Sequence, residues 1–147
     1  MFTIRSILHP TDFSECSRYA FRIAVDLARQ HGASLLALHV APPLSEERVS
    51  FGEAAAPQPD EYHRRVAEAE REATAAGPGV AVERLVEGGE PAHVVARVAR
   101  ERDCDLIVIG SHGRTGLERI LMGSTAEHIV RLAPCPVLVV KIPPGAG

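Results

Sequence analysis

The sequence predicts an α/β fold: a doubly wound, five-stranded parallel sheet with helices on both faces. Three observations support this prediction. Short apolar runs alternate regularly with longer stretches of helical periodicity along the chain. The run at 105–109 is apolar almost without interruption, as expected of a strand covered on both faces. The length of 147 residues suits one domain of this kind. Right-handed crossovers then leave only a few doubly wound strand orders.

The first half of the chain is predicted from its apolar runs and its stop signals. After Phe13, apolar residues recur every three or four positions, which is helical spacing. Pro10 is expected to end the strand before this helix, and Gly32 is expected to end the helix itself. The predicted elements are a strand at 4–9, a helix at 13–31, a strand at 34–40 and an irregular, variable loop at 41–58.

The second half repeats the alternation after a break at Gly77-Pro78-Gly79. Pro91 suits the first turn of a helix, where its missing N–H costs nothing. The predicted elements are a helix at 60–76, strands at 80–86, 105–109 and 136–140, a helix that begins at 91, a loop at 110–123 and a helix at 125–132. Residues 1–142 are predicted to form a single domain, and residues 143–147 a flexible tail.

Composition excludes several classes of function. A net charge of −3 gives no electrostatic reason to expect nucleic acid or an anionic membrane as a partner. No apolar run approaches the roughly 20 residues that a membrane-spanning helix needs. The three cysteines are odd in number and lack CxxC spacing, which indicates a reducing, cytoplasmic location. Of the 16 cationic residues, 15 are arginines and only Lys141 is a lysine.

Polar residues follow two of the predicted strands, at the sheet edge where doubly wound proteins bind ligands. Pro10-Thr11-Asp12 follows the first strand, and a glycine-bearing loop follows the fourth. That loop leads into Gly123-Ser124-Thr125 at a predicted helix start, where N–H groups, hydroxyls and the helix dipole favour an anion such as a polyphosphate. Structural alternatives stay open: the glycines can serve a turn, the hydroxyls a helix cap, and Asp12 the cap of the helix near Phe13.

Two common nucleotide motifs are absent. A Walker A loop needs a lysine directly before its Ser or Thr, but Gly123 stands there and Lys141 lies directly after the last predicted strand. The GxGxxG fingerprint of dinucleotide sites is also missing. In the loop itself, Arg114 is a candidate for neutralising phosphate or a solvated side chain. His112 has no carboxylate at motif spacing to orient it, so we do not predict a catalytic residue there.

Four positions of this loop match a known signature. Gly110-x2-Gly113-x9-Gly123-Ser124 matches, without a gap, the G-2x-G-9x-G-[S/T] signature of ATP-binding universal stress proteins. Residues 7–14, 89–91 and 133–140 resemble that family's opening strand and turn, its G-[DE]-P helix entry and its final strand. The sequence therefore resembles a universal stress protein of the ATP-binding subgroup over essentially its whole length.

The resemblance implies the adenine nucleotide alpha hydrolase-like fold with strand order 3-2-1-4-5, and ATP with Mg²⁺ as ligand. By resemblance, Asp12 contacts the ribose or the metal, backbone groups of Thr11 and Val40 face the adenine, and Ile109 forms the pocket floor. By the same resemblance, Gly110, Gly113, Gly123, Ser124 and Thr125 hold the triphosphate. The implied binding residues are Pro10, Thr11, Asp12, Val40, Ile109, Gly110, Gly113, Arg114, Gly123, Ser124 and Thr125.

The resemblance also implies a homodimer. In this family the fifth strand lies at the sheet edge and commonly pairs with its twofold mate. The strand at 137–140 reads Val-Leu-Val-Val, and an exposed apolar edge of this kind favours association. The alternative is that the tail at 143–147 covers the edge.

Three functions compete at this stage. The sequence favours an ATP-binding regulatory or stress-response protein, because phosphate recognition rests on glycine backbone and hydroxyls and not on a lysine. The alternative is a slow ATPase or nucleotidyl transferase that uses the same site. A KH-like RNA-binding GxxG loop is the weakest reading, since that loop joins two helices and Gly110-x-x-Gly113 follows a strand.

Overall fold

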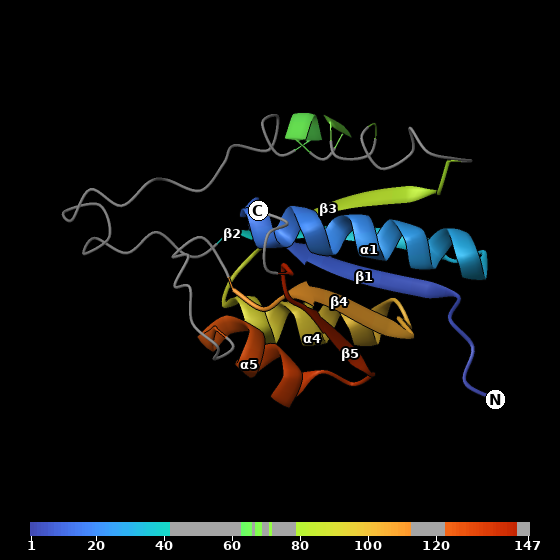
Figure 1. The fold of residues 1–147 in the computed structure, drawn as a ribbon. Coiled ribbons are helices and arrows are strands. Elements are labelled where there is room, and N and C mark those ends of the chain that lie inside the picture. The colour runs from blue at the N-terminus through green and yellow to red at the C-terminus, as the bar shows by residue number, and fades with distance from the viewer. Residues whose placement is uncertain (42–62, 66, 69–70, 72–78, 113–122, 144–147) are drawn as a thin grey trace.

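The computed structural model describes residues 1–41, 63–65, 67–68, 71, 79–112 and 123–143. They contain a parallel sheet of five strands in the order β3-β2-β1-β4-β5 (Figure 1). The elements are β1 (Ser6–Thr11), α1 (Glu15–His31), β2 (Ser34–Ala41), β3 (Val82–Gly88), α4 (Pro91–Glu101), β4 (Leu106–Gly110), α5 (Ser124–Leu132) and β5 (Val137–Val140). The predicted fold class and strand order are confirmed.

Helices cover both faces of the sheet, with α1 on one face and α4 and α5 on the other (Figure 1). Successive residues of a strand point to opposite faces, so each central strand contributes to two apolar cores. Ile7 and Val108 belong to the core beneath α1, whereas Leu8 and Ile107 belong to the core beneath α4 and α5. Because the face alternates from one strand residue to the next, the face on which any strand residue lies follows from these core residues.

Several predicted segments fall outside the described residues. Of the predicted helix at 60–76, residues 63–65, 67, 68 and 71 are described and are helical. The predicted loop at 41–58 is described only at Ala41, which ends β2, and the predicted tail only at Pro143. In the described part of the chain, no helix is both long and apolar enough to cross a membrane.

Helix α1 begins two residues later than predicted. Phe13 has a φ of 63°, a left-handed conformation that cannot continue into a right-handed helix. Ser14 is the N-cap, and its Oγ accepts a hydrogen bond from Ser17 N at 3.1 Å. Asp12 instead accepts from Ser14 N at 2.9 Å, so the alternative that Asp12 caps the helix is wrong. Gly32 ends α1 with a φ of 64°, as predicted.

Strand β1 runs through Pro10, so the prediction that Pro10 ends the strand is wrong. On the β2 side the pairing continues to Thr11 opposite His39. On the β4 side the pairing ends at Leu8, which lies opposite Ile107. Proline lacks the N–H that a ladder needs and is tolerated where a strand has one paired side. The strand therefore persists on β2 and separates from β4.

The side chain of His9 replaces the missing amide of Pro10. The N–H groups of Ile107 and Ser111 bond to the β5 side, at Pro136 O and Val140 O, so the intervening Val108 faces β1. In a continuous ladder Val108 O would accept from the N–H of residue 10. Here His9 Nδ1 donates to Val108 O at 2.8 Å, and the imidazole is completely buried. The carbonyl thus keeps a donor although the strand offers none.

We predict that substitutions at His9 and Pro10 are coupled. His9→Leu leaves Val108 O buried without a donor, which costs about 1–3 kcal/mol. Pro10→Ala restores an N–H, so in the His9→Leu background it should recover part of that loss, with a coupling of about 1 kcal/mol. Urea unfolding of wild type, both single variants and the double variant gives the coupling. Additive effects would contradict the assignment.

Candidate functional site

The ends of β1 and β4 meet where the winding of the sheet reverses. The chain moves from β1 toward β2 and β3 in one direction, then returns past β1 to β4 and β5. Ligands of doubly wound sheets bind in the crevice at this point. The pairing of β1 with β4 reaches only Leu8 and Ile107. β1 ends at Thr11, which Asp12 follows, and β4 ends with Ile109 and Gly110.

The turn after β1 is fixed by hydrogen bonds from neighbouring elements. Thr11 Oγ1 accepts from Phe13 N at 3.2 Å and from Ser17 Oγ at 2.9 Å. Thr11 O accepts from His39 Nδ1 of β2 at 3.3 Å. One oxygen of Asp12 accepts from Ser14 N. The carboxylate has a second oxygen, which can accept a ribose hydroxyl or bind a hard cation.

Three of the predicted residues share one side of the sheet. Ile109 is 3% exposed and belongs to the core beneath α4 and α5, and Val40 packs against that core. Pro10 follows Leu8 at a spacing of two, which places it on the same side. Thr11 directly follows Pro10. Because strand side chains alternate between the faces of the sheet, its side chain lies on the α1 side.

Gly110 has a packing role that the sequence did not reveal. A Cβ at this position would lie 2.9 Å from Cys16 Sγ, 3.1 Å from Cys16 C and 3.2 Å from Cys16 O. Two of these atoms belong to the backbone of α1, so they cannot rotate away. Gly110 is therefore required for α1 to approach the end of β4, whatever part it has in binding a ligand.

The start of α5 carries another part of the predicted phosphate site, Gly123, Ser124 and Thr125. Gly123 is the N-cap and makes no side-chain capping bond, so it leaves N–H groups of the first turn to other acceptors. Gly123 N donates to Ser111 O at 2.7 Å, which holds this start beside the end of β4. Ser124 and Thr125 are exposed. Gly113 and Arg114 lie outside the described residues.

His112 stands at the beginning of the same loop, with its Nδ1 3.0 Å from the hydroxyl oxygen of Ser111. Ser111 is almost completely buried, and its Oγ lies 3.7 Å from Cys16 Sγ. The strand end, the start of α1 and the start of α5 are thus joined through Ser111.

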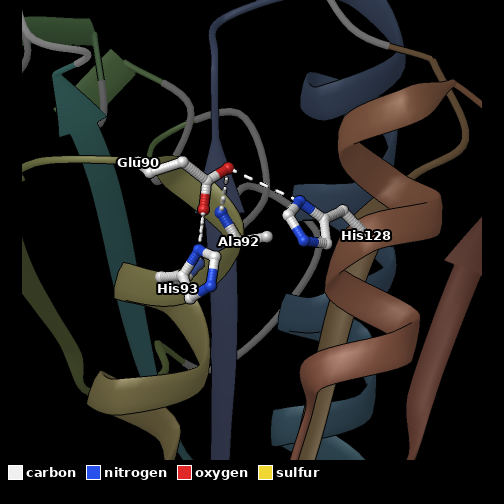
Figure 2. A network of polar contacts seen from close by, with 4 residues as sticks. All are labelled: Glu90, Ala92, His93 and His128. Atoms are coloured by element: carbon white, nitrogen blue, oxygen red, sulfur yellow. Dashed lines mark hydrogen bonds and ion pairs between the residues drawn. The ribbon is translucent and has the colours of Figure 1, made fainter.

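A carboxylate ties the start of α4 to the middle of α5 (Figure 2). Glu90 is the N-cap of α4: its carboxylate accepts from Ala92 N at 3.3 Å and from His93 N at 2.9 Å, and it also contacts His93 Nδ1. From α5, His128 Nδ1 lies 3.6 Å from Glu90 Oε1. Burial raises the pKa of Glu90, but the hydrogen bonds from His93 and Ala92 outweigh it and lower that pKa below its usual value.

Sequence spacing did not reveal that His93 and His128 are neighbours. Their ring centres lie 5.3 Å apart, edge to face (Figure 2). Among the described residues, no group of three His, Cys, Asp or Glu side chains is arranged to hold a metal ion. We therefore assign this network a structural role, which fixes α5 relative to α4.

Comparison with known proteins places the chain among proteins of one family. The model of the Universal stress protein family matches residues 3–141. The chain is 34% identical to the universal stress protein MJ0531 of Methanocaldococcus jannaschii over 146 residues, which covers 95% of this chain and 83% of that protein. The solved structure of UspA from Lactobacillus plantarum has a TM-score of 0.78 and 26% identity, covering 94% of this chain and 98% of its own.

Two similar structures contain adenine nucleotides. A universal stress protein in complex with cAMP has a TM-score of 0.67 and 26% identity, and the match covers 94% of this chain and 97% of that one. The universal stress protein from Archaeoglobus fulgidus in complex with dAMP has a TM-score of 0.64 and 23% identity, with 96% and 100% covered, and shows the shared fold.

The burial of His9 predicts a pH dependence of stability. Burial lowers the pKa of His9 to about 4, although the bond to Val108 O and the charge of Asp12 raise it. The folded chain therefore keeps His9 neutral while the unfolded chain binds a proton below about pH 6.5. Stability should fall as the pH falls from about 6.5 to about 4, by at most about 3 kcal/mol.

The measurement is the free energy of unfolding in urea between pH 4 and 8, for wild type and His9→Gln. Glutamine does not titrate, so the difference between the two curves isolates His9 from the other histidines and the carboxylates. Parallel curves would show that His9 titrates normally.

Proposed function

Because the chain belongs to the universal stress protein family, we propose that it binds ATP with Mg²⁺ at the carboxyl edge of its sheet. The protein would act as a nucleotide-dependent regulatory or stress-response protein. The observation that carries this proposal is the start of α5, where Gly123 provides no side-chain cap and is held beside β4 by its bond to Ser111 O. An uncapped helix start at a switch point is a ready anion site.

The described residues suggest how the nucleotide would lie. The triphosphate would meet the N–H groups and hydroxyls of Gly123, Ser124 and Thr125, together with Gly110 and the signature residues Gly113 and Arg114. The positive end of the α5 dipole favours this charge. Helix α5 is itself fixed by the Glu90 network, so the phosphate groups would meet a preformed arrangement.

The base and ribose would lie at the ends of β1 and β2. The apolar side of this edge, formed by Pro10, Val40 and Ile109, would contact the adenine, and backbone groups of Thr11 and Val40 would bond to it. Asp12 would use its second oxygen for the ribose or for Mg²⁺. The cAMP-bound relative supports an adenine ligand, and the G-2x-G-9x-G-[S/T] signature favours ATP over a cyclic nucleotide.

Binding is favoured over turnover because the signature loop has no lysine, the residue that P-loop enzymes use at the phosphates. Lys141 is its single lysine and lies just after β5. The signature loop carries two arginines, Arg114 and Arg119, and the resemblance assigns neither of them a catalytic role. Slow hydrolysis or nucleotidyl transfer at the same site is the alternative, and phosphate release by the wild type and by Asp12→Asn separates the two.

We further propose a cytoplasmic homodimer that pairs through β5. Strand β5 is an edge of the sheet, and it consists of four apolar residues. Leu138 is 40% exposed, and Val130 of the neighbouring α5 is 43% exposed. A second copy would cover the exposed side chains of Leu138 and Val130.

Gly123→Val should reduce ATP affinity without unfolding the protein. The φ of −63° and ψ of 156° at Gly123 are open to valine, but the side chain would obstruct the α5 start. Loss of one charge-assisted hydrogen bond to phosphate costs about 1.5–3 kcal/mol, or about 10- to 100-fold in Kd. Gly79→Val is the matched control, because a Cβ there meets no described atom within 4 Å.

The measurements are calorimetric titration with Mg-ATP and mass spectrometry of small molecules released when the purified protein is denatured. Copurified ATP that is lost in Gly123→Val and kept in Gly79→Val is the expected result. Cyclic AMP in its place would keep the site and change the ligand. No adenine nucleotide and no binding on titration would refute the proposal.

Asp12→Asn should weaken Mg-ATP binding while leaving the fold intact. The amide oxygen of asparagine still accepts from Ser14 N, so the turn is preserved and only the charge is removed. ATP affinity should fall by about tenfold in Mg²⁺ and by less in EDTA. Phosphate release by the wild type at saturating Mg-ATP is measured in parallel: repeated turnovers that Asp12→Asn abolishes would favour the enzyme over the regulatory protein.

A further inference from the structure

A cavity lies on the α1 side of the sheet, at the carboxyl half of β1. Its volume is about 330 Å³, within the range of about 300–1,000 Å³ typical of small-molecule sites. Its lining includes His9 of β1, Ala37 of β2 and Phe21 of α1, and also Arg64, which belongs to the helical residues 63–65 and 67–68. The cavity is therefore bounded by two helical segments and by the sheet.

This cavity differs from the proposed nucleotide site by its side of the sheet. Ala37 belongs to the core beneath α1, and His9 shares this side because it follows Ile7 at a spacing of two. Val40 and Ile109, which are proposed to contact the adenine, pack in the core beneath α4 and α5. The two places therefore lie on opposite faces of the sheet.

A buried hydrogen-bond acceptor lines the cavity. His9 Nδ1 lies 2.8 Å from Val108 O, which can only accept, so Nδ1 carries the proton. Burial lowers the pKa of His9 to about 4, so the ring is neutral at neutral pH and its Nε2 is an acceptor. This Nε2 is buried and has no hydrogen-bond partner among the described residues. A ligand that offers one O–H or N–H group would satisfy it.

Aromatic and apolar surface surrounds this acceptor. The ring centres of Phe21 and His9 lie 5.5 Å apart. Ala37 adds a methyl group to the lining, and Phe13 adds a second phenyl ring. Ring edges and faces favour a flat aromatic ligand. No surface of His9 is open to water, so a side chain beside it must shift before the donor of a ligand can reach Nε2.

The charged side chains of the lining are engaged within the protein. Arg64 Nη1 lies 3.8 Å from Glu68 Oε1, and both side chains line the cavity. The Arg65 guanidinium lies 5.3 Å from the centre of the Phe13 ring, and Arg18 also takes part in an interaction with the rest of the chain. A ligand without charge leaves these interactions in place. We therefore assign recognition to the acceptor of His9 and to the rings, and not to charge.

We propose that this cavity is a second ligand site, which binds a small uncharged aromatic molecule that carries one O–H or N–H group. The ring of the ligand would lie against Phe21 and Ala37, and its donor would bond to His9 Nε2. This site is additional to the proposed nucleotide site and does not depend on it.

Three probes of similar size separate the ring from the donor. Phenol carries both, anisole has the ring and the oxygen without the hydrogen, and cyclohexanol has the hydroxyl group without the aromatic ring. Calorimetry should show phenol binding about tenfold more tightly than anisole and about threefold more tightly than cyclohexanol. In ¹⁵N-histidine-labelled protein, phenol should move the Nε2 resonance of His9, and anisole should leave it near its ligand-free position.

His9→Asn tests the acceptor while it keeps a donor for Val108 O. The amide nitrogen of asparagine can take the place of Nδ1 and donate, but no atom replaces Nε2. The preference for phenol over anisole should therefore disappear in this variant. A tenfold preference that persists in His9→Asn would overturn the proposal.

Variants on β2 supply a second test with a matched control, and they leave His9 unchanged. Ala37→Val adds two methyl groups at the cavity lining and should weaken phenol binding by about tenfold. Leu38→Val changes the next residue, which lies in the opposite core, and should bind phenol as the wild type does. No binding of phenol, equal binding of all three probes, or an unchanged Kd in Ala37→Val would overturn the proposal.

The phenol titration is repeated at saturating Mg-ATP, because Thr11 lines the cavity and is also a predicted adenine contact through its backbone. An unchanged Kd for phenol supports a separate site, whereas competition would place phenol in the nucleotide site and overturn the proposal. If the protein binds no ATP, the probe series and the His9 resonance still decide the question, so failure of either proposal is recognised separately.

Discussion

The missing amide hydrogen of Pro10 is the constraint on which the carboxyl edge of the sheet depends. A central strand needs hydrogen bonds on both sides, and Pro10 cannot give one to β4. The recorded pairing with β4 accordingly stops at Leu8, while the pairing with β2 runs on to Thr11. His9 satisfies the carbonyl of Val108 from its side chain. The strands can thus separate at the switch point without leaving a buried carbonyl unpaired.

The same bond fixes the chemistry of His9. Its donor nitrogen is committed to Val108 O, and burial keeps the ring neutral by lowering the pKa to about 4. A protonated ring would carry a second N–H into a site with no acceptor for it among the described residues. One imidazole thereby completes the ladder on its Nδ1 side and presents an acceptor on its Nε2 side.

The sequence predicted the structure that depends on neighbouring residues. It missed the structure that depends on contacts between residues far apart in the chain. Helix α1 followed from its own apolar spacing and from Gly32, and the strands followed from short apolar runs. The strand order came from the family resemblance and not from periodicity. The errors at Pro10 and Asp12 arose because a partner 99 residues away and a left-handed Phe13 decide these local structures. The meeting of His93 with His128 was equally invisible along the chain.

Gly110 and Gly123 of the signature differ in why the position is a glycine. Gly110 must be glycine because the backbone of Cys16 lies where its Cβ would be. Gly123 has no such reason in its own conformation, since its φ of −63° and ψ of 156° suit any residue, and a serine or aspartate there would cap α5 better. A helix start that forgoes a capping side chain, yet is fixed beside β4 by its own N–H, keeps its amides for another acceptor. Packing explains Gly110, and the anion that we propose at the start of α5 would explain Gly123.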